Sequence, residues 1–167
     1  MSLKYKGFPT SAPVSIVGFS DSDYPSCSDT RHPESGHAFM LNDCAMSWLT
    51  KKQQSVASST RQAEYMALAT TSHQGVWYRN PLTQLDDTIP IKIMADNTCS
   101  MNVAENPITN PRAKHIDVAY PFTREHLICK YFTLSYVPCN DNTADLITKA
   151  FNSVAYHVHT QCLGLSE

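Results

Sequence analysis

The chain has 167 residues, of which 42% are hydrophobic, so it is long enough for one domain with a buried core and is not intrinsically disordered. No apolar run approaches the roughly 20 residues that cross a bilayer, so we expect no membrane partner. The formal charge of −2 argues against strong autonomous binding of nucleic acid, because phosphate neutralisation supplies much of that affinity. It does not exclude a nuclease whose carboxylates hold metal ions, although a neighbouring domain would then help to hold the substrate.

Cysteine usage points to a reducing compartment. The N-terminus has no apolar stretch after its lysines and does not resemble a secretory signal. Without a C-x-x-C pair, we expect free thiols, several of them packed as small hydrophobes, at all six positions: Cys27, Cys44, Cys99, Cys129, Cys139 and Cys162. His157, His159 and Cys162 have no second ligand pair at zinc spacing, so we attribute their proximity to chance.

The first third of the chain has the pattern of strands. Residues 1–13 are predicted to be a lead-in or linker, followed by a single domain over residues 14–167. Residues 14–20 form a β-branched run typical of a strand, and the Ser-, Asp- and Pro-rich residues 21–36 indicate a loop. Two apolar stretches within residues 37–52 flank Asn42 and Asp43, which predicts a hairpin with a two-residue turn.

Helical spacing begins after this hairpin. Residues 58–85 predict a long helix with N-cap candidates at Ser58, Ser59 and Thr60, and with Pro81 at its end or at a kink. Residues 91–96, a short apolar run ending in Asp, predict a buried strand. Residues 97–107 predict a short helix that ends at a proline.

The remaining residues complete an α/β fold. We expect a loop over residues 106–114, partial helix over residues 115–130 with Pro121 at a kink or a start, and a strand over residues 131–137. A last helix begins at Thr143 and resumes after a break within residues 157–165. This order predicts a mixed five-stranded sheet, three antiparallel strands followed by parallel additions, with helices on its faces.

Four carboxylates stand out by their positions. Asp21 follows the first strand, Asp96 ends the fourth, Glu64 lies one turn into the long helix, and Asp145 begins the last helix. Ligand sites of α/β sheets collect at the carboxyl ends of strands, so Asp21 and Asp96 meet if their strands are parallel neighbours. Taken singly, each of these residues is also explained by a turn, a helix cap or a solvated helix face.

A cluster of four acids requires cations, because like charges at short distance repel one another and raise their pKa values. Hard oxygen ligands suit Mg²⁺, which binds through a few carboxylates and substrate phosphate oxygens. Two such ions about 4 Å apart activate a water and stabilise the leaving oxygen of an in-line displacement.

The sequence segments around the four acids resemble those of a known family. Five ordered blocks, GFSDSDYPSCSDTRHPESG, MSWLTKKQQSVASSTRQAEYMALA, MADNTCSMNVAENP, RAKHIDVAYPFTRE and SYVPCNDNTADLITKAF, resemble the ribonuclease H of Ty1/copia-type retrotransposons over roughly nine-tenths of the chain. The resemblance implies a ribonuclease H-like fold with an Asp-Glu-Asp-Asp metal site. Its ligands fall on Asp21, Glu64, Asp96 and Asp145, and Asp23 is given a loop or supporting role.

The resemblance also implies an activity. We expect two Mg²⁺ ions, replaceable by Mn²⁺, and hydrolysis of the RNA strand of an RNA/DNA hybrid to 3′-hydroxyl and 5′-phosphate ends, with Glu64 helping to position the water. In a full element the domain would follow a reverse transcriptase and act in cytoplasmic virus-like particles, in the nucleus, or in both.

The chain departs from the family in two respects. Pro81 and Pro121 stand where the family's helices usually run smoothly, and a proline inside a helix costs roughly 3 kcal/mol. Many relatives also place a His in the loop before the last Asp, and here that loop, VPCNDNTAD, has none. Either Asn140 or Asn142 substitutes, or turnover is slow. The role of His115 stays open, with packing preferred to catalysis.

Contacts to the hybrid are predicted on polar residues near the acids, namely Ser59, Thr60, Asn97, Arg112, Lys114 and Asn142. For all of these residues except Asn142, capping or surface solvation is the slightly preferred explanation. Lys51 and Lys52 beside Trp48 are interpreted as a solvated strand end next to a core tryptophan rather than as a basic–aromatic patch.

Two other functions remain as alternatives. An integrase or transposase of the same superfold needs a late Glu, but Glu105 and Glu125 do not fall at convincing positions. A catalytically weak or inactive domain retained for binding nucleic acid or protein fits the prolines and the acidic charge, but does not explain four intact carboxylates. An aspartic protease is disfavoured because no D-[ST]-G motif occurs.

Overall fold

The computed structural model describes residues 2–3, 14–24, 32–54, 57–82, 91–106, 119–149, 156–157, 160–161 and 163–166. Its elements in chain order are β1 (Ser2–Leu3), β2 (Ile16–Asp23), β3 (Glu34–Leu41), β4 (Cys44–Lys52), α1 (Thr60–Leu82), β5 (Ile91–Ala95), α2 (Thr98–Glu105), α3 (Ala119–Ile128), β6 (Phe132–Tyr136), the 3₁₀ turn Cys139–Asp141, α4 (Asp145–Thr148) and β7 (Leu165–Ser166). Among these residues, no helix has the length and apolar character needed to traverse a bilayer.

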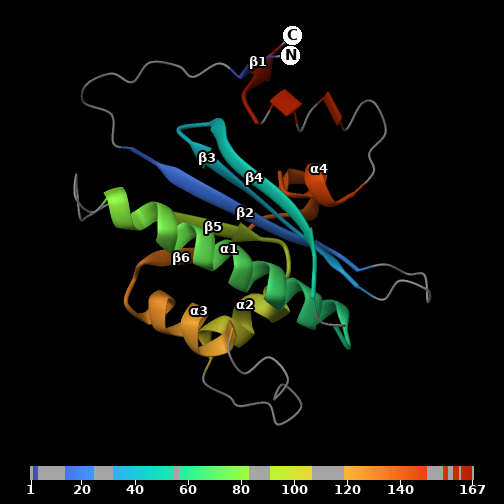
Figure 1. Ribbon diagram of the computed structural model, residues 1–167, viewed down its shortest axis with the longest axis vertical. Helices are drawn as coiled ribbons and strands as arrows, with labels where there is room; N and C mark the ends of the chain where they lie inside the picture. The colour runs from blue at the N-terminus through green and yellow to red at the C-terminus, as the bar shows by residue number, and fades with distance from the viewer. Residues whose placement is uncertain are drawn as a thin grey trace.

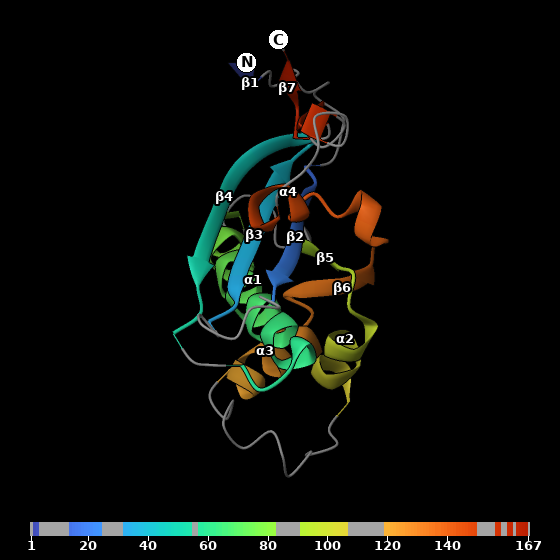
Figure 2. The same cartoon turned by 90° about the vertical axis from the view of Figure 1, so that its right-hand side faces the viewer.

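The main sheet has five strands in the order β4-β3-β2-β5-β6 (Figure 1). The pairs β2–β3 and β3–β4 are antiparallel, whereas β2–β5 and β5–β6 are parallel. This is the mixed sheet that the sequence predicts. A separate two-stranded pairing joins β1 to β7, so segments from the two ends of the chain lie side by side (Figure 2).

The predicted hairpin is confirmed, and the backbone conformation of its turn explains why Asn42 and Asp43 stand there. Asn42 and Asp43 have positive φ angles of 43° and 65°, a left-handed conformation that Asn and Asp tolerate better than other side chains. The Asn42 side chain also accepts a 2.7 Å hydrogen bond from the backbone N–H of Ser15, which directly precedes β2.

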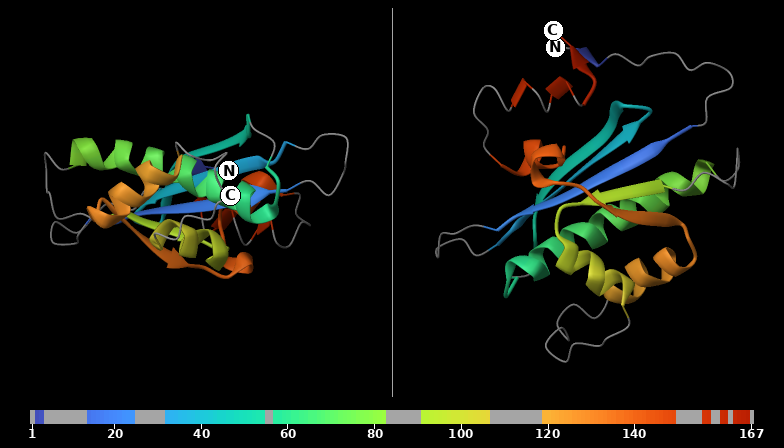
Figure 3. Two further views of the ribbon diagram at one scale, coloured as in Figure 1. Left: turned by 90° about the horizontal axis from the view of Figure 1, so that it is seen from below. Right: turned by 180° about the vertical axis from the view of Figure 1, so that it is seen from behind.

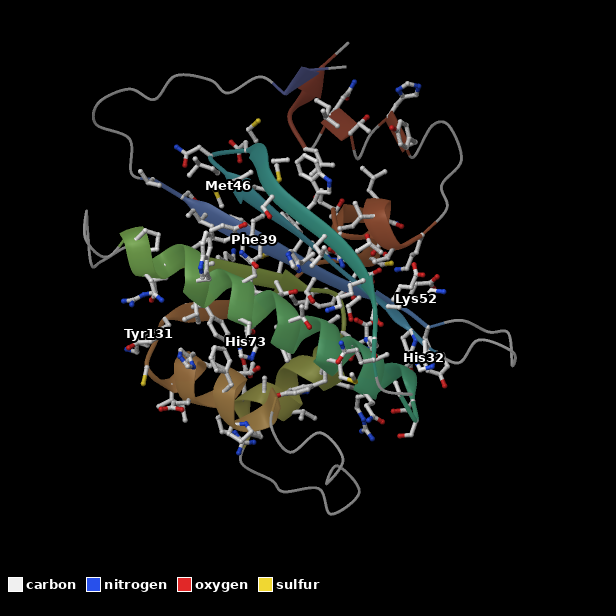
Figure 4. The ribbon with its side chains drawn as sticks, viewed as in Figure 1. His32, Phe39, Met46, Lys52, His73 and Tyr131 are labelled. Atoms are coloured by element: carbon white, nitrogen blue, oxygen red, sulfur yellow. The ribbon has the colours of Figure 1, made fainter. Side chains whose placement is uncertain are left out.

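The two faces of the sheet are covered differently. Helix α1 packs on one face over a large apolar cluster that includes Leu68, Ile93 and Phe39, the last of which is labelled in Figure 4. Helices α2 and α3 pack against α1. The short helix α4 lies on the opposite face, as the rear view in Figure 3 shows, over a smaller cluster of Ala38, Met40, Ala45 and Leu163.

The structure corrects the expected positions of several residues. Strand β2 continues through Asp23, because its antiparallel pairing with β3 extends to Glu34, whereas its parallel pairing with β5 ends at Ser20. Asp21 and Asp23 are therefore strand residues and not loop residues. Trp48 is 58% exposed on the edge strand β4, so its assignment to the core was wrong.

The two prolines do not interrupt a helix interior. Pro121 is the third residue of α3, where the backbone N–H has no helical acceptor in any case, which confirms the expected start. Pro81 lies in the last turn of α1. Leu165, predicted to continue a helix, belongs to β7. Arg112, Lys114 and His115 lie outside the described residues.

Candidate metal centre

The four predicted carboxylates come together at one end of the sheet. Asp96 directly follows β5, and Asp21 lies one residue beyond Ser20, which pairs with Ala95 at the end of the parallel ladder. Ligand atoms of Asp21, Glu64 and Asp96 lie within 4.8 Å of one another. Those of Asp96, Cys139 and Asp145 form a second such group, so Asp96 is common to both. The two groups together hold all four acids.

Glu64 reaches the site from the second turn of α1. Its neighbours Ala63 and Tyr65 are buried, which fixes this turn against the sheet. The helix begins just before, where the Ser59 hydroxyl accepts a 3.2 Å hydrogen bond from the Gln62 N–H. The capping explanation of Ser59 therefore describes what its side chain does in this structure.

Asp145 is placed by the loop that precedes α4. The fully buried Asn142 donates from Nδ2 to the carbonyl of Ser20 at 3.0 Å and accepts at Oδ1 from the Ala144 N–H at 3.2 Å. These bonds attach the loop to the end of β2, next to Asp21. Asn142 thus has a structural role and no surface to offer a substrate.

A glycine allows α4 to approach the sheet. Gly36 pairs with Asp21 across the β2–β3 ladder. A Cβ atom at Gly36 would lie 2.3 Å from Thr148 Cγ2, far inside van der Waals contact. Only glycine leaves room for Thr148, whose hydroxyl donates a short hydrogen bond to Asp21 Oδ2.

A lysine that the sequence analysis missed joins two of the acids. Lys149 Nζ lies 3.1 Å from Asp21 Oδ1 and 3.0 Å from Asp145 Oδ1. Its position four residues after Asp145, within the TADLITKAF block, was the available signal. Cys139 was also missed, and its thiol donates to Asp145 Oδ2 at 3.2 Å.

The electrostatics of the cluster favour added cations. Burial, followed by repulsion from Asp21 and Asp96, raises the pKa of Glu64 to about 9. Burial and the charge of Asp21 raise the pKa of Asp145 to about 6, despite the opposing effects of Cys139 and Lys149. Buried carboxylates that resist ionisation next to one another are a donor set suited to a hard divalent cation. The ammonium of Lys149 already marks the place of one positive charge.

The other predicted contacts lie around this centre. Thr60 is exposed at the start of α1. Asn97 follows Asp96, and its side-chain oxygen caps α2 by accepting from the Ser100 N–H at 3.0 Å. Asp23 is in β2 and outside both groups of ligand atoms. Glu105 and Glu125 are exposed on α2 and α3, away from the four acids.

Comparison with known proteins places the chain among retrotransposon sequences. It is 30% identical over 154 residues to a retrovirus-related Pol polyprotein from transposon RE2 of Arabidopsis thaliana, covering 91% of this chain. It is 28% identical over 159 residues to the Pol polyprotein from transposon TNT 1-94 of Nicotiana tabacum, covering 95% of this chain. The chain spans only 11% and 12% of these relatives. No protein-family model matches it.

Solved structures share the fold. The N-terminal RNase H domain of a Mycobacterium tuberculosis protein superposes with a TM-score of 0.55 at 15% identity, covering 89% of this chain and 98% of that one. LC11-RNase H1 in complex with an RNA/DNA hybrid gives 0.52 at 10% identity, covering 77% and 88%. The protease-reverse transcriptase of prototype foamy virus gives 0.51 at 13% identity, covering 100% of this chain and 23% of that one.

Proposed function

We propose that this chain, a homologue of a segment of Ty1/copia-type retrotransposon Pol polyproteins with the ribonuclease H fold, is a metal-dependent nuclease that hydrolyses the RNA strand of RNA/DNA hybrids. The observation that carries the proposal is the convergence of Asp21, Glu64 and Asp96 from β2, α1 and β5, with Asp145 joining through Asp96. A packing role alone does not explain why separate segments bring carboxylates together, because their negative charges repel one another.

The carboxylates would hold two Mg²⁺ ions, with Mn²⁺ as a substitute. Asp21, Glu64 and Asp96 would provide one set of oxygens. Asp96 and Asp145, together with the Asp21 oxygen that faces Asp145 across the Lys149 ammonium, would provide the other. When bound, such ions lower the pKa of a water and neutralise charge on the phosphate and the leaving oxygen. Glu64 would orient the water. The water oxygen forms a bond to phosphorus, the bond to the 3′ oxygen breaks, and that oxygen takes up a proton.

The substrate and partners follow from the relatives. One structural neighbour was solved with an RNA/DNA hybrid, and another contains a reverse transcriptase. We propose the hybrid as substrate, with Thr60 and the start of α1 beside its backbone, and a reverse transcriptase domain upstream in the same polyprotein. An intracellular place of action, in virus-like particles or the nucleus, follows from that role.

The test is cleavage of a hybrid with a labelled RNA strand, in Mg²⁺ and then in Mn²⁺. Wild type should cut the RNA strand alone, and Asp21→Asn should not cut. Asp43→Asn is the matched control, because Asp43 lies in the hairpin turn at the other end of the sheet and its φ of 65° suits asparagine. A folded wild type that cuts in neither metal, with or without an added reverse transcriptase, would favour a domain retained for binding.

A further inference from the structure

Only one side of the carboxylate cluster forms ion pairs with a basic residue of the protein. Both oxygens of Asp21 are engaged, Oδ1 by Lys149 and Oδ2 by Thr148. Asp145 is bound to the same ammonium at 3.0 Å. In contrast, within the described part of the chain, neither Glu64 nor Asp96 has an ion pair. One side of the site therefore holds a cation supplied by the protein, and the other side does not.

We propose that Lys149 is an internal counterion that occupies the Asp21–Asp145 side of the site until a divalent cation displaces it. This inference rests on the proposed function and makes the two metal positions unequal. The first ion binds on the Glu64–Asp96 side. The second must take the place of the ammonium, so Lys149 sets the affinity for the second ion and the order of binding.

The geometry allows the displacement to be local. Lys149 follows the last residue of α4, and its side chain is 33% exposed, so part of the side chain is already in contact with solvent. A lysine has a flexible four-carbon stem, and its ammonium is compact and strongly hydrated. Its withdrawal requires side-chain rotation and no movement of α4, which Thr148 and Gly36 keep against the sheet.

Electrostatics make the competition strong. The ammonium lies 3.1 Å from Asp21 Oδ1 and 3.0 Å from Asp145 Oδ1, so an ion that takes its ligands from these same oxygens must compete with it for the position. An ordinary stabilising ion pair would also strengthen the metal-free fold. It would not, however, weaken the binding of one metal ion selectively. Metal affinity therefore distinguishes a displaceable counterion from an ordinary ion pair.

The experiment titrates Mn²⁺ into the protein, with free Mn²⁺ counted by electron paramagnetic resonance and heats measured by calorimetry. Wild type should bind two ions with clearly different affinities. Lys149→Met should bind the second ion at least tenfold more tightly, and Lys149→Arg should stay near wild type. Lys92→Met is the control for lost charge, since Lys92 is exposed on β5. An unchanged second affinity in Lys149→Met, or an equal gain in Lys92→Met, overturns the proposal.

A second measurement needs no variant, in case Lys149→Met does not fold without metal. The acetylation rate of Lys149 in wild type, measured by mass spectrometry, should rise severalfold when Mn²⁺ is added, while that of Lys92 stays constant. A constant Lys149 rate would contradict displacement. Hybrid cleavage separates the two proposals: a chain with this metal behaviour that does not cut refutes only the nuclease, and a cutting chain without it refutes only the lysine's role.

Discussion

The two faces of the sheet have different roles, one in stability and the other in placing the acidic residues. The face under α1 buries large side chains such as Phe39, Leu68 and Phe132 against a helix of 23 residues. The face under α4 has a smaller apolar cluster, and its four-residue helix is held by contacts of Asn142, Gly36 and the Thr148 hydroxyl. The first face supplies stability through apolar area, and the second places Asp21 and Asp145 through specific contacts. Changes on the two faces should therefore have separable effects.

The largest stability change is expected under α1. Phe39 is fully buried and meets Tyr78 edge-on at a centroid distance of 5.1 Å. Phe39→Ala should cost roughly 3–5 kcal/mol by cavity formation, or about 10 °C in Tm. Met40→Ala, one residue along but on the α4 face, should cost about 2 kcal/mol in its smaller cluster. Thermal unfolding measures both, and equal losses would refute the contrast between the faces.

Gly36→Ala should damage the metal centre more than the fold. The added Cβ would overlap Thr148, so α4 must move and carry Asp145 with it. We expect Mn²⁺ affinity to fall by about tenfold, roughly 1.4 kcal/mol. Gly75→Ala, within α1, is the matched control, because its Cβ would make an ordinary 3.5 Å contact with Ile93 and alanine favours helix. Unchanged metal affinity in Gly36→Ala would contradict the role assigned to this glycine.

The raised pKa of Glu64 should be visible in how the free energy of unfolding depends on pH. Its pKa rises from 4.5 to about 9 on folding, so the folded protein keeps a proton that the unfolded chain releases between those values. Metal-free stability must then fall as pH rises across this window. Glu64→Gln should flatten the slope and gain at least about 1 kcal/mol at pH 8, a few degrees in Tm. If the stability of Glu64→Gln fell with pH as steeply as that of wild type, another titratable group would cause the pH dependence.

The smallest expected effect concerns the reactivity of Cys139. Partial burial and then its hydrogen bond to Asp145 raise the pKa of this thiol to about 12, although the side chain is exposed. Since the thiolate is the reactive form, Cys139 should react more slowly with iodoacetamide than the exposed Cys99 and Cys129. Mass spectrometry gives the three rates, and Asp145→Asn should accelerate only Cys139. Three equal rates would argue against the bond to Asp145.

Sequence patterns predicted much of this molecule for physical reasons. Apolar periodicity identified the five main strands and α1, because burial on one side imposes it. The turn at Asn42 and Asp43 followed from the left-handed conformation that such residues tolerate. The four acids stood out by their positions, but each taken singly also had a plain structural explanation, so their assignment rested on the resemblance of the surrounding blocks to the ribonuclease H of Ty1/copia-type retrotransposons.

Other features could not be read from local pattern. The extension of β2 through Asp21 depends on pairing with β3, a distant segment. Trp48 looked like a core residue because its strand is apolar, but β4 is at the edge of the sheet. Lys149 was not singled out from the sequence, because only the fold brings it to Asp21, 128 positions away. Asn142 acts through one long-range bond to Ser20 that no spacing reveals.

The most direct test of the central claim uses Asp96, the acid that belongs to both groups of ligand atoms. The rate of RNA-strand cleavage in a labelled RNA/DNA hybrid is measured in Mg²⁺ for wild type and for Asp96→Asn, both shown to be folded. A metal-dependent nuclease at this site predicts cleavage by wild type and a loss on the order of 100-fold or more in the variant. Cleavage at equal rates would show that the chemistry occurs elsewhere, and the account of the four carboxylates would be wrong.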